Sequence, residues 1–265
     1  MRKLLGLAIA SLVLFGCANL YEKFYVDNLS KNPKARHLII PSVGKPEIVS
    51  GSNDKKLDNI RMFENGYMSI GYSSFHATRG ASRDNLIEQA KKVGAAKVLF
   101  YKKYMSTESG SVPITVPTTQ TTYHSGGVSA YGTGGSAYGS YSGTSTTYGT
   151  STSHIPYTRH RYEYGASFWV KIKMLALGVR FREPTPQEKS NAGTNKGAII
   201  VAVRKGGPAF NADLVPNDLV LAINQEEIAS KIDLQRTLKK YHGQLVTLDI
   251  IRKGQRIRKQ VQLNN

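Results

Sequence analysis

Gly197-Ala-Ile-Ile-Val-Ala-Val203 is a nearly continuous apolar run, and Gly206-Gly207-Pro208 turns the chain directly after it. An apolar run between turn residues predicts a buried β-strand, and the proline favours a short helix that begins at Pro208. The turn pair Asn217-Asp218 leads into a second apolar run over residues 219–223. Because asparagine and aspartate favour turns, this run predicts another buried strand.

The end of the chain completes this predicted domain. Leu234 and Leu238 lie one helical turn apart within residues 232–241, which places them on one face of a helix. Two late strands are predicted over residues 246–252 and 255–263, separated by a Lys-Gly turn. Together these elements predict a small, partly open β-barrel with two helices.

Residues 174–265 resemble the PDZ domain that bacterial HtrA-type proteases carry. The resemblance rests on the order of separated segments, which are Leu175-Ala-Leu-Gly-Val-Arg-Phe181, 197–203, Gly207-Pro-Ala209, Ala212-Asp-Leu214, 217–224, 232–241 and 246–254. It implies that an extended or C-terminal peptide adds as a strand at a sheet edge. The chain before this domain is too short for the double-barrel protease domain of that family, so we expect a PDZ domain without a protease domain.

The resemblance also implies where a peptide would bind. Ala176-Leu177-Gly178-Val179 occupies the position of the carboxylate-binding loop, and glycine at the third position lets backbone amides converge. Along the edge strand that follows, apolar side chains alternate onto one face and Arg180 points the other way. The predicted peptide-binding residues are Ala176, Leu177, Gly178, Val179, Arg180, Phe181, Leu234 and Leu238. Ala176 departs from the tyrosine that bacterial relatives often have, and ordinary core packing stays open as the alternative for the apolar members.

The N-terminus predicts export. Leu14-Phe15-Gly16-Cys17 closes a short apolar run that follows Arg2-Lys3. The run falls short of the roughly 20 residues that span a bilayer as a helix, and it is typical of a cleaved export signal. Its last four residues resemble the bacterial lipobox, which implies a lipoprotein signal peptide over residues 1–16 and acyl chains such as palmitate on Cys17. Ala18 in place of aspartate implies transfer to the outer membrane, at its periplasmic face or at the cell surface.

Cys17 is the only cysteine of the 265 residues. Once acylated it leaves no thiol, which excludes disulfides, thiolate metal sites and cysteine nucleophiles. The six histidines show no close ligand spacing, and the glycine-rich string at residues 132–137 lacks the strand and helix that a dinucleotide site needs. We therefore predict no metal, no cofactor and no enzymatic activity.

Between the two ends, the pattern predicts a tether and a small domain. Residues 17–44 have few periodic apolar positions and are predicted to be a membrane tether. Strands alternate with helices from residue 45 to residue 173, which argues for a small α/β domain. The predicted strands cover residues 47–49, 67–72, 96–104 and 162–172, and the predicted helices cover residues 55–64 and 83–93. With the PDZ domain, the fold class is α+β.

A low-complexity insert interrupts this domain over residues 106–158. Residues 109–158 carry no charged side chain and consist mostly of Gly, Ser, Thr and Tyr. Such a composition buries little apolar area, so we expect a long disordered and flexible insert, with a loose hairpin at its base as a variant. A flexible linker is the favoured interpretation, and sugar binding by the spaced tyrosines is the alternative.

The formal net charge of +18 bears on the partners. No basic run is interleaved with aromatic residues, so we expect no nucleic acid as a partner. We predict a lipid-anchored adaptor or scaffold that binds the C-termini or extended segments of partner proteins. The alternative is a structural envelope component that binds glycan, peptidoglycan or lipopolysaccharide through the insert and the basic surface.

Overall fold

The computed structural model describes residues 19–78 and 81–265, which fold as two compact units. One unit combines the described residues up to Lys103 with Tyr162–Asn265, and the other is Tyr104–Arg161. Both helices and strands build the first unit, so the predicted α+β class is confirmed. No helix in the described part of the chain has the length and apolar character to cross a membrane.

The N-terminal domain is built on a five-stranded sheet in the order β1-β3-β5-β4-β2. β3 pairs antiparallel with β1 and β5, whereas β2 and β4 are parallel. Its strands are β1 (Tyr25–Asp27), β2 (Glu47–Ser50), β3 (Tyr67–Ala77), β4 (Lys97–Gly132) and β5 (Gly135–Lys171), and its helices are α1 (Leu20–Lys23), the 3₁₀ helix η1 (Pro33–Leu38), α2 (Lys55–Glu64) and α3 (Arg83–Lys92). The predicted helices begin where the sequence indicates, because Asp54 and Ser82 cap the first turns of α2 and α3.

The two faces of this sheet are covered unequally. On one face, the main core packs α1 and α3 against the strands, with Leu86, Phe75 and Phe168 buried at its centre. On the other face a smaller cluster joins Met62 of α2 to Leu99 and Trp169. The face beneath α2 is therefore the less completely covered one.

The tether predicted over residues 17–44 is wrong from Asn19 onward. Tyr21 is buried in the main core, with 1% of its surface exposed. β1 pairs with β3, and Ile39 forms a β-bridge with Ile172. This segment packs on the domain through aromatic side chains whose spacing matches neither a helix nor a strand. The periodicity of the sequence therefore did not predict it. Cys17 and the predicted signal peptide lie outside the described residues.

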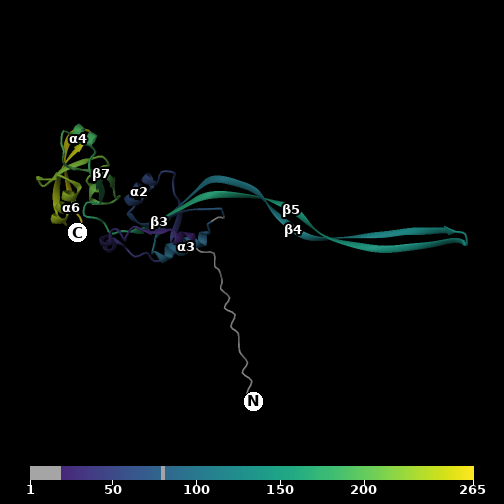
Figure 1. The fold of residues 1–265 in the computed structure, drawn as a ribbon. Helices are drawn as coiled ribbons and strands as arrows, with labels where there is room; N and C mark the ends of the chain where they lie inside the picture. The colour runs from purple at the N-terminus through teal and green to yellow at the C-terminus, as the bar shows by residue number, and fades with distance from the viewer. Residues whose placement is uncertain (1–18, 79–80) are drawn as a thin grey trace, which may run out of the picture. The chain divides into compact units, whose positions relative to one another are not determined.

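The second unit is a two-stranded β-ribbon formed by the outer parts of β4 and β5 (Figure 1). The sequence predicts a disordered insert here, and that prediction is wrong in the structure. Serine and threonine hydroxyls pair across the two strands, for example Thr115 with Thr152 at 2.9 Å. Backbone pairing and β-branched side chains can therefore order a segment that has no core of its own.

The C-terminal domain is a second antiparallel sheet in the order β11-β10-β8-β7-β6, with β9 paired to β8. Its strands are β6 (Val179–Arg182), β7 (Ala198–Val203), β8 (Leu219–Ile223), β9 (Glu226–Glu227), β10 (Leu245–Arg252) and β11 (Gln255–Gln262), and its helices are α4 (Pro186–Ala192), α5 (Pro208–Asn211) and α6 (Lys231–Lys240). Each strand and helix predicted in this domain has its counterpart, and α4 is an additional helix. β6 is the edge strand of this sheet.

Candidate functional site

The loop that leads into the edge strand β6 carries the first part of the candidate site. Gly178 has a φ of +74°, a conformation that L side chains rarely adopt. A Cβ added there would meet its nearest neighbours at 3.6 Å, which is ordinary contact. The requirement for glycine therefore comes from the backbone conformation rather than from lack of space.

Hydrogen bonds hold this loop by its carbonyl groups. The oxygens of Ala176, Leu177 and Gly178 accept from the amides of Asn264 at 2.9 Å, Ala209 at 3.0 Å and Arg204 at 2.8 Å. Within the described part of the chain, the amides of Leu177 and Gly178 donate to no partner. A loop with tied carbonyls and free adjacent amides presents donors to an anion.

The apolar residues predicted for the groove come together in one cluster. Leu177, Val179, Leu234 and Leu238 are buried members of the C-terminal core, and Phe181 packs against it. They connect the loop, β6 and α6, as the sequence indicates. Because the first four are almost fully buried, a bound segment would touch mainly Phe181 and the backbone edge of β6.

Glu183 closes the far end of β6, and the sequence carries no signal for it. Its Oε1 accepts a hydrogen bond at 3.0 Å from the amide of Lys231, the first residue of α6. A carboxylate at this place also suits the positive end of the helix dipole. The edge strand and the long helix are thus joined at one end, while the free amides lie at the other.

Comparison with known proteins agrees with this geometry. Residues 176–263 match the family model of the PDZ domain. The C-terminal domain is a PDZ domain. The match covers only this domain, and the N-terminal domain and the ribbon lie outside it.

Curated relatives match over the PDZ portion. The probable periplasmic serine endoprotease DegP-like of Chlamydia trachomatis is 36% identical over 75 residues, which are 27% of this chain and 15% of that protein. The protein of the same name from Chlamydia muridarum is 34% identical over 85 residues, 31% of this chain and 17% of that one. This chain therefore spans about a sixth of the length of the curated relatives that it matches.

Solved structures of HtrA-type proteins are also similar to part of this chain. The HtrA-type protease AlgW with a decapeptide is 24% identical, with a TM-score of 0.28, and the match covers 33% of this chain and 28% of that one. The HtrA3 PDZ domain bound to a phage-derived ligand is 16% identical, with a TM-score of 0.30, and the match covers 33% of this chain and 83% of that one.

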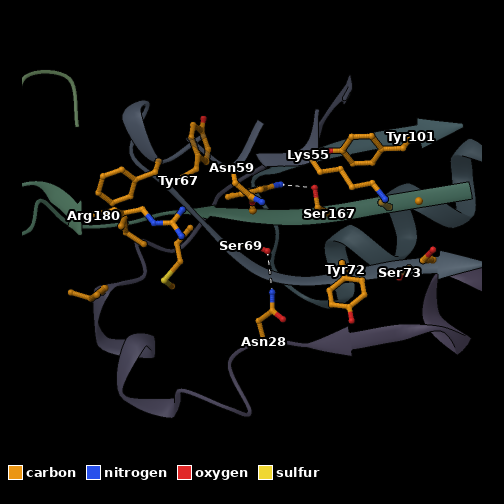
Figure 2. Close-up of a pocket in the computed structure, with 18 of the residues that line it drawn as sticks. Asn28, Lys55, Asn59, Tyr67, Ser69, Tyr72, Ser73, Tyr101, Ser167 and Arg180 are labelled. Atoms are coloured by element: carbon orange, nitrogen blue, oxygen red, sulfur yellow. Dashed lines mark hydrogen bonds between the residues drawn. The ribbon is translucent and has the colours of Figure 1, made fainter. Parts of the chain in front are cut away.

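The remaining predicted site residue, Arg180, lies on the other face of β6 from Val179 and Phe181. Its guanidinium lies over the ring of Phe63, 5.7 Å from the centroid. Figure 2 shows it at one end of a trench on the sheet face that α2 covers only in part. The structure thus separates Arg180 from the apolar members of the predicted groove.

That trench has a volume of about 710 Å³ and is lined by aliphatic side chains and aromatic rings with polar groups between them. Lys55 lies at the other end of it from Arg180, over the ring of Tyr101 at 5.5 Å (Figure 2). Between them, Asn28 donates to Ser69 at 3.2 Å and Trp169 donates to Ser167 at 2.8 Å. Among the described residues that line the trench, none is acidic, and Lys55 and Arg180 are its cations.

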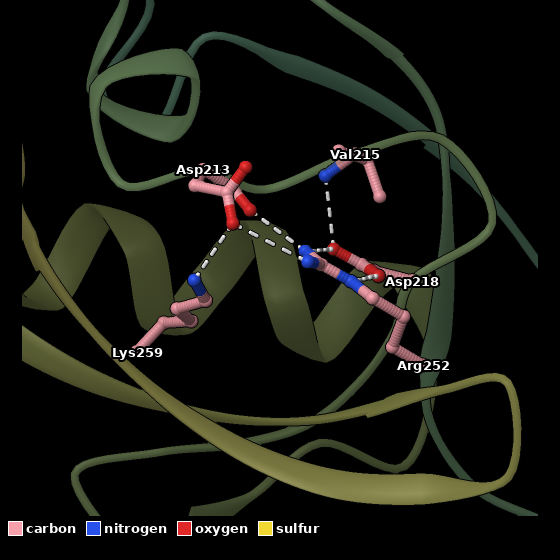
Figure 3. Close-up of polar contacts among 5 residues, drawn as sticks. All are labelled: Asp213, Val215, Asp218, Arg252 and Lys259. Atoms are coloured by element: carbon pink, nitrogen blue, oxygen red, sulfur yellow. Dashed lines mark hydrogen bonds and ion pairs between the residues drawn. The ribbon is translucent and has the colours of Figure 1, made fainter.

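A buried ion pair stabilises the frame of the PDZ domain (Figure 3). Asp218, whose surface is 0% exposed, accepts from Arg252 Nε at 2.7 Å and Nη2 at 2.8 Å. The amide of Val215 adds a third hydrogen bond at 2.9 Å. The hydrogen bonds with Asp218 are the main reason that the pKa of Arg252 is raised. This pair joins the turn before β8 to the end of β10.

No metal centre was recognised among the residues that the structure describes, since no three His, Cys, Asp or Glu side chains gather there in a group able to hold an ion. Burial lowers the pKa of Arg204, whose guanidinium donates to the carbonyl oxygens of Lys173 and Ile172. These contacts fix the segment that enters the PDZ domain just before the binding loop.

Proposed function

We propose that this chain is a lipid-anchored protein of the bacterial envelope whose PDZ domain binds extended or C-terminal peptide segments of partner proteins. Its role would be that of an adaptor or scaffold without enzymatic activity, which holds a partner near the membrane. The observation that carries the proposal is the pair of free amides at Leu177 and Gly178 beside an edge strand with no outer neighbour in its sheet.

The chemistry of binding follows from these groups. A peptide carboxylate placed on the two amides would accept charge-assisted hydrogen bonds, which are stronger than neutral ones. The residues before the carboxylate would pair with the outer edge of β6 as an added strand. Because the loop is already held through its carbonyls, little ordering of the site would accompany binding.

The envelope location rests on two supports. The curated relatives are named as periplasmic proteins, and Leu14–Cys17 resembles a lipobox. A lipid anchor with several acyl chains would be firm, since each buried methylene contributes about 0.8 kcal/mol. The lipid would attach at Cys17, on the outer membrane.

The test is a titration of the full-length chain with C-terminal peptide libraries and with the same peptides amidated at the C-terminus. Free peptides should bind saturably, and amidation should weaken binding by roughly 10- to 100-fold, because a hydrogen bond to a charged group is worth about 1.5–3 kcal/mol. Gly178→Trp should abolish binding, since the indole and the strained φ disturb the loop.

Gly193→Trp is the matched control, because Gly193 also has a positive φ, of +62°, but ends α4 with open space around it. It should keep the affinity of the parent. Equal binding of free and amidated peptides, or no saturable binding below millimolar concentration, would reject the proposal.

A further inference from the structure

The register of the β-ribbon can be followed from Thr107 and His160 to the turn. Cross-strand side-chain contacts join Thr107 to His160, Ser109 to Thr158 and Thr115 to Thr152. The strands end at Gly132 and Gly135 with a two-residue turn between them. In each of these pairs, and in the pair Gly132 and Gly135, the two residue numbers add up to the same total. The register near Thr107 is therefore the same as at the turn, and side chains alternate between the two faces without interruption.

The two faces of the ribbon differ in chemistry. The face that carries Thr115 and Thr152 presents almost only hydroxyl-bearing side chains, with proline and histidine between them. The opposite face carries four exposed β-branched residues close together, because Val112 faces Ile155 in this register. These four, called the apolar strip below, are Val112, Ile114, Val116 and Ile155, and each is between 43% and 51% exposed.

Prolines near the strip interrupt the outer edges of the ribbon. In a hairpin closed by a two-residue turn, the closing pair is hydrogen-bonded, and pairs alternate from there with non-hydrogen-bonded ones. Pro113, Pro117 and Pro156 fall at non-hydrogen-bonded positions, where a backbone N–H would point outward. They therefore fit inside the ribbon and remove three of the outward-pointing donors with which a third strand would pair, whereas Thr115 keeps its own outward N–H.

Charge also distinguishes the ribbon from the rest of the molecule. The chain carries a formal charge of +18, but residues 109–158 carry no charged side chain. Glu108, Arg159 and Arg161 lie at the base of the ribbon, outside this uncharged stretch. Residues 109–158 are therefore a segment in which two copies can meet without like-charge repulsion between the surfaces in contact. They also offer no charge by which a different partner would be selected.

We infer that the apolar strip is a self-association surface, on which the ribbon of a second copy packs face to face. An isolated two-stranded hairpin is marginally stable, and a second layer supplies the apolar contacts that it lacks. Two-fold packing of sheets about 10 Å apart lets β-branched side chains interdigitate, and identical strips are complementary to each other. Ile114 lies at the centre of the strip and would face its own symmetry mate.

The experiment uses the full-length chain with Cys17→Ser, which removes the only natural thiol. In this background, Ile114→Cys should form covalent dimers under mild oxidation. Thr115→Cys, one residue away on the hydroxyl face, should not. Equal cross-linking of both variants, or none in either, would overturn the inference.

Sedimentation equilibrium tests the same surface without a thiol. The Cys17→Ser parent should reach the dimer mass, and Ile114→Glu should weaken dimerisation at least about tenfold because it buries a charge in an apolar contact. Thr115→Glu is the matched control and should behave as the parent. A monomeric parent whose flotation with lipid vesicles is lost in Ile114→Glu would show that the strip binds lipid, and the inference would then be wrong.

Discussion

Among single residues, Asp218 lies in a turn and stabilises the PDZ domain through several hydrogen bonds. Its carboxylate meets the guanidinium of Arg252 through two hydrogen bonds and the amide of Val215 through a third. Asp213 contacts the same guanidinium from the outside, with its side chain 71% exposed. Burial therefore differs greatly between two carboxylates that share one cation.

Asp218→Asn should lower the free energy of unfolding by about 3 kcal/mol, because it leaves a largely buried cation with only the exposed carboxylate of Asp213 beside it. Urea denaturation of the full-length chain, followed by a probe of the PDZ domain, measures the change. Asp213→Asn removes the same charge from an exposed pair and should lower the free energy of unfolding much less, because water screens that contact. Similar losses in the two variants would contradict this account.

The sequence predicts some residues of the candidate site and not others. Leu177, Val179, Leu234 and Leu238 follow from alternation and helical spacing, and the structure gathers them in one cluster. The contacts of Glu183 with Lys231 connect residues 48 positions apart. No local pattern encodes such a pair, because both residues are ordinary exposed polar positions in sequence.

At the scale of elements, α4 is the helix of the PDZ domain that the sequence analysis missed. It has only seven residues and no buried side chain, so it lacks an apolar stripe. Its signal is a capping box, in which the Thr185 side chain accepts from Glu188 N and the Glu188 side chain accepts from Thr185 N. Arg182 adds a two-pronged ion pair to Glu188 at 2.6 and 2.7 Å.

This arrangement predicts a pH-dependent contribution to stability. The hydrogen bonds with Arg182, followed by that from the Thr185 amide, lower the pKa of Glu188 from 4.5 to about 2. A lowered pKa in the folded state stabilises the fold above the unfolded pKa, and the gain is lost as pH falls from about 5 toward 2. Because the side chains of Arg182 and Glu188 are 41% and 32% exposed, solvent screens the pair and we expect a contribution of about 1 kcal/mol.

Urea denaturation at several pH values compares the parent with Glu188→Gln. The difference in unfolding free energy should be largest above about pH 5 and should shrink toward pH 2. In an Arg182→Met background the same substitution should have little effect, since the main cause of the pKa shift is gone. A difference that stays constant across this range would show that the pair is not responsible.

The ribbon is the element whose amino-acid composition gave a wrong prediction of disorder. Low complexity and the absence of charge predict disorder because they predict no core, and indeed no residue of Tyr104–Arg161 is buried. The ordering signal is the alternation of threonine, valine and isoleucine, together with prolines confined to outward positions. Both signals depend on which residues occupy alternate positions along a strand, and the amino-acid composition holds no information about positions.

At the scale of the whole molecule, the cores explain why the two units are separable. The buried side chains of the described chain belong to the N-terminal sheet and the PDZ domain, and residues 104–161 contribute none. Stability of the first unit comes mainly from that burial. Residues 104–161 can therefore serve association while the first unit keeps its own fold.

Replacing residues 109–158 by Asn-Gly should leave the unfolding midpoint of the first unit and its peptide affinity unchanged, because Glu108 and Arg159 face each other in the register of the ribbon and can be joined by a tight hairpin turn. Thermal unfolding and peptide titration measure both properties. The shortened chain should also stay in the membrane fraction of a bacterial host, whereas Cys17→Ser in the complete chain should release the protein. Release of the shortened chain with Cys17 intact would instead support the structural alternative, in which the ribbon holds the protein to glycan or lipopolysaccharide.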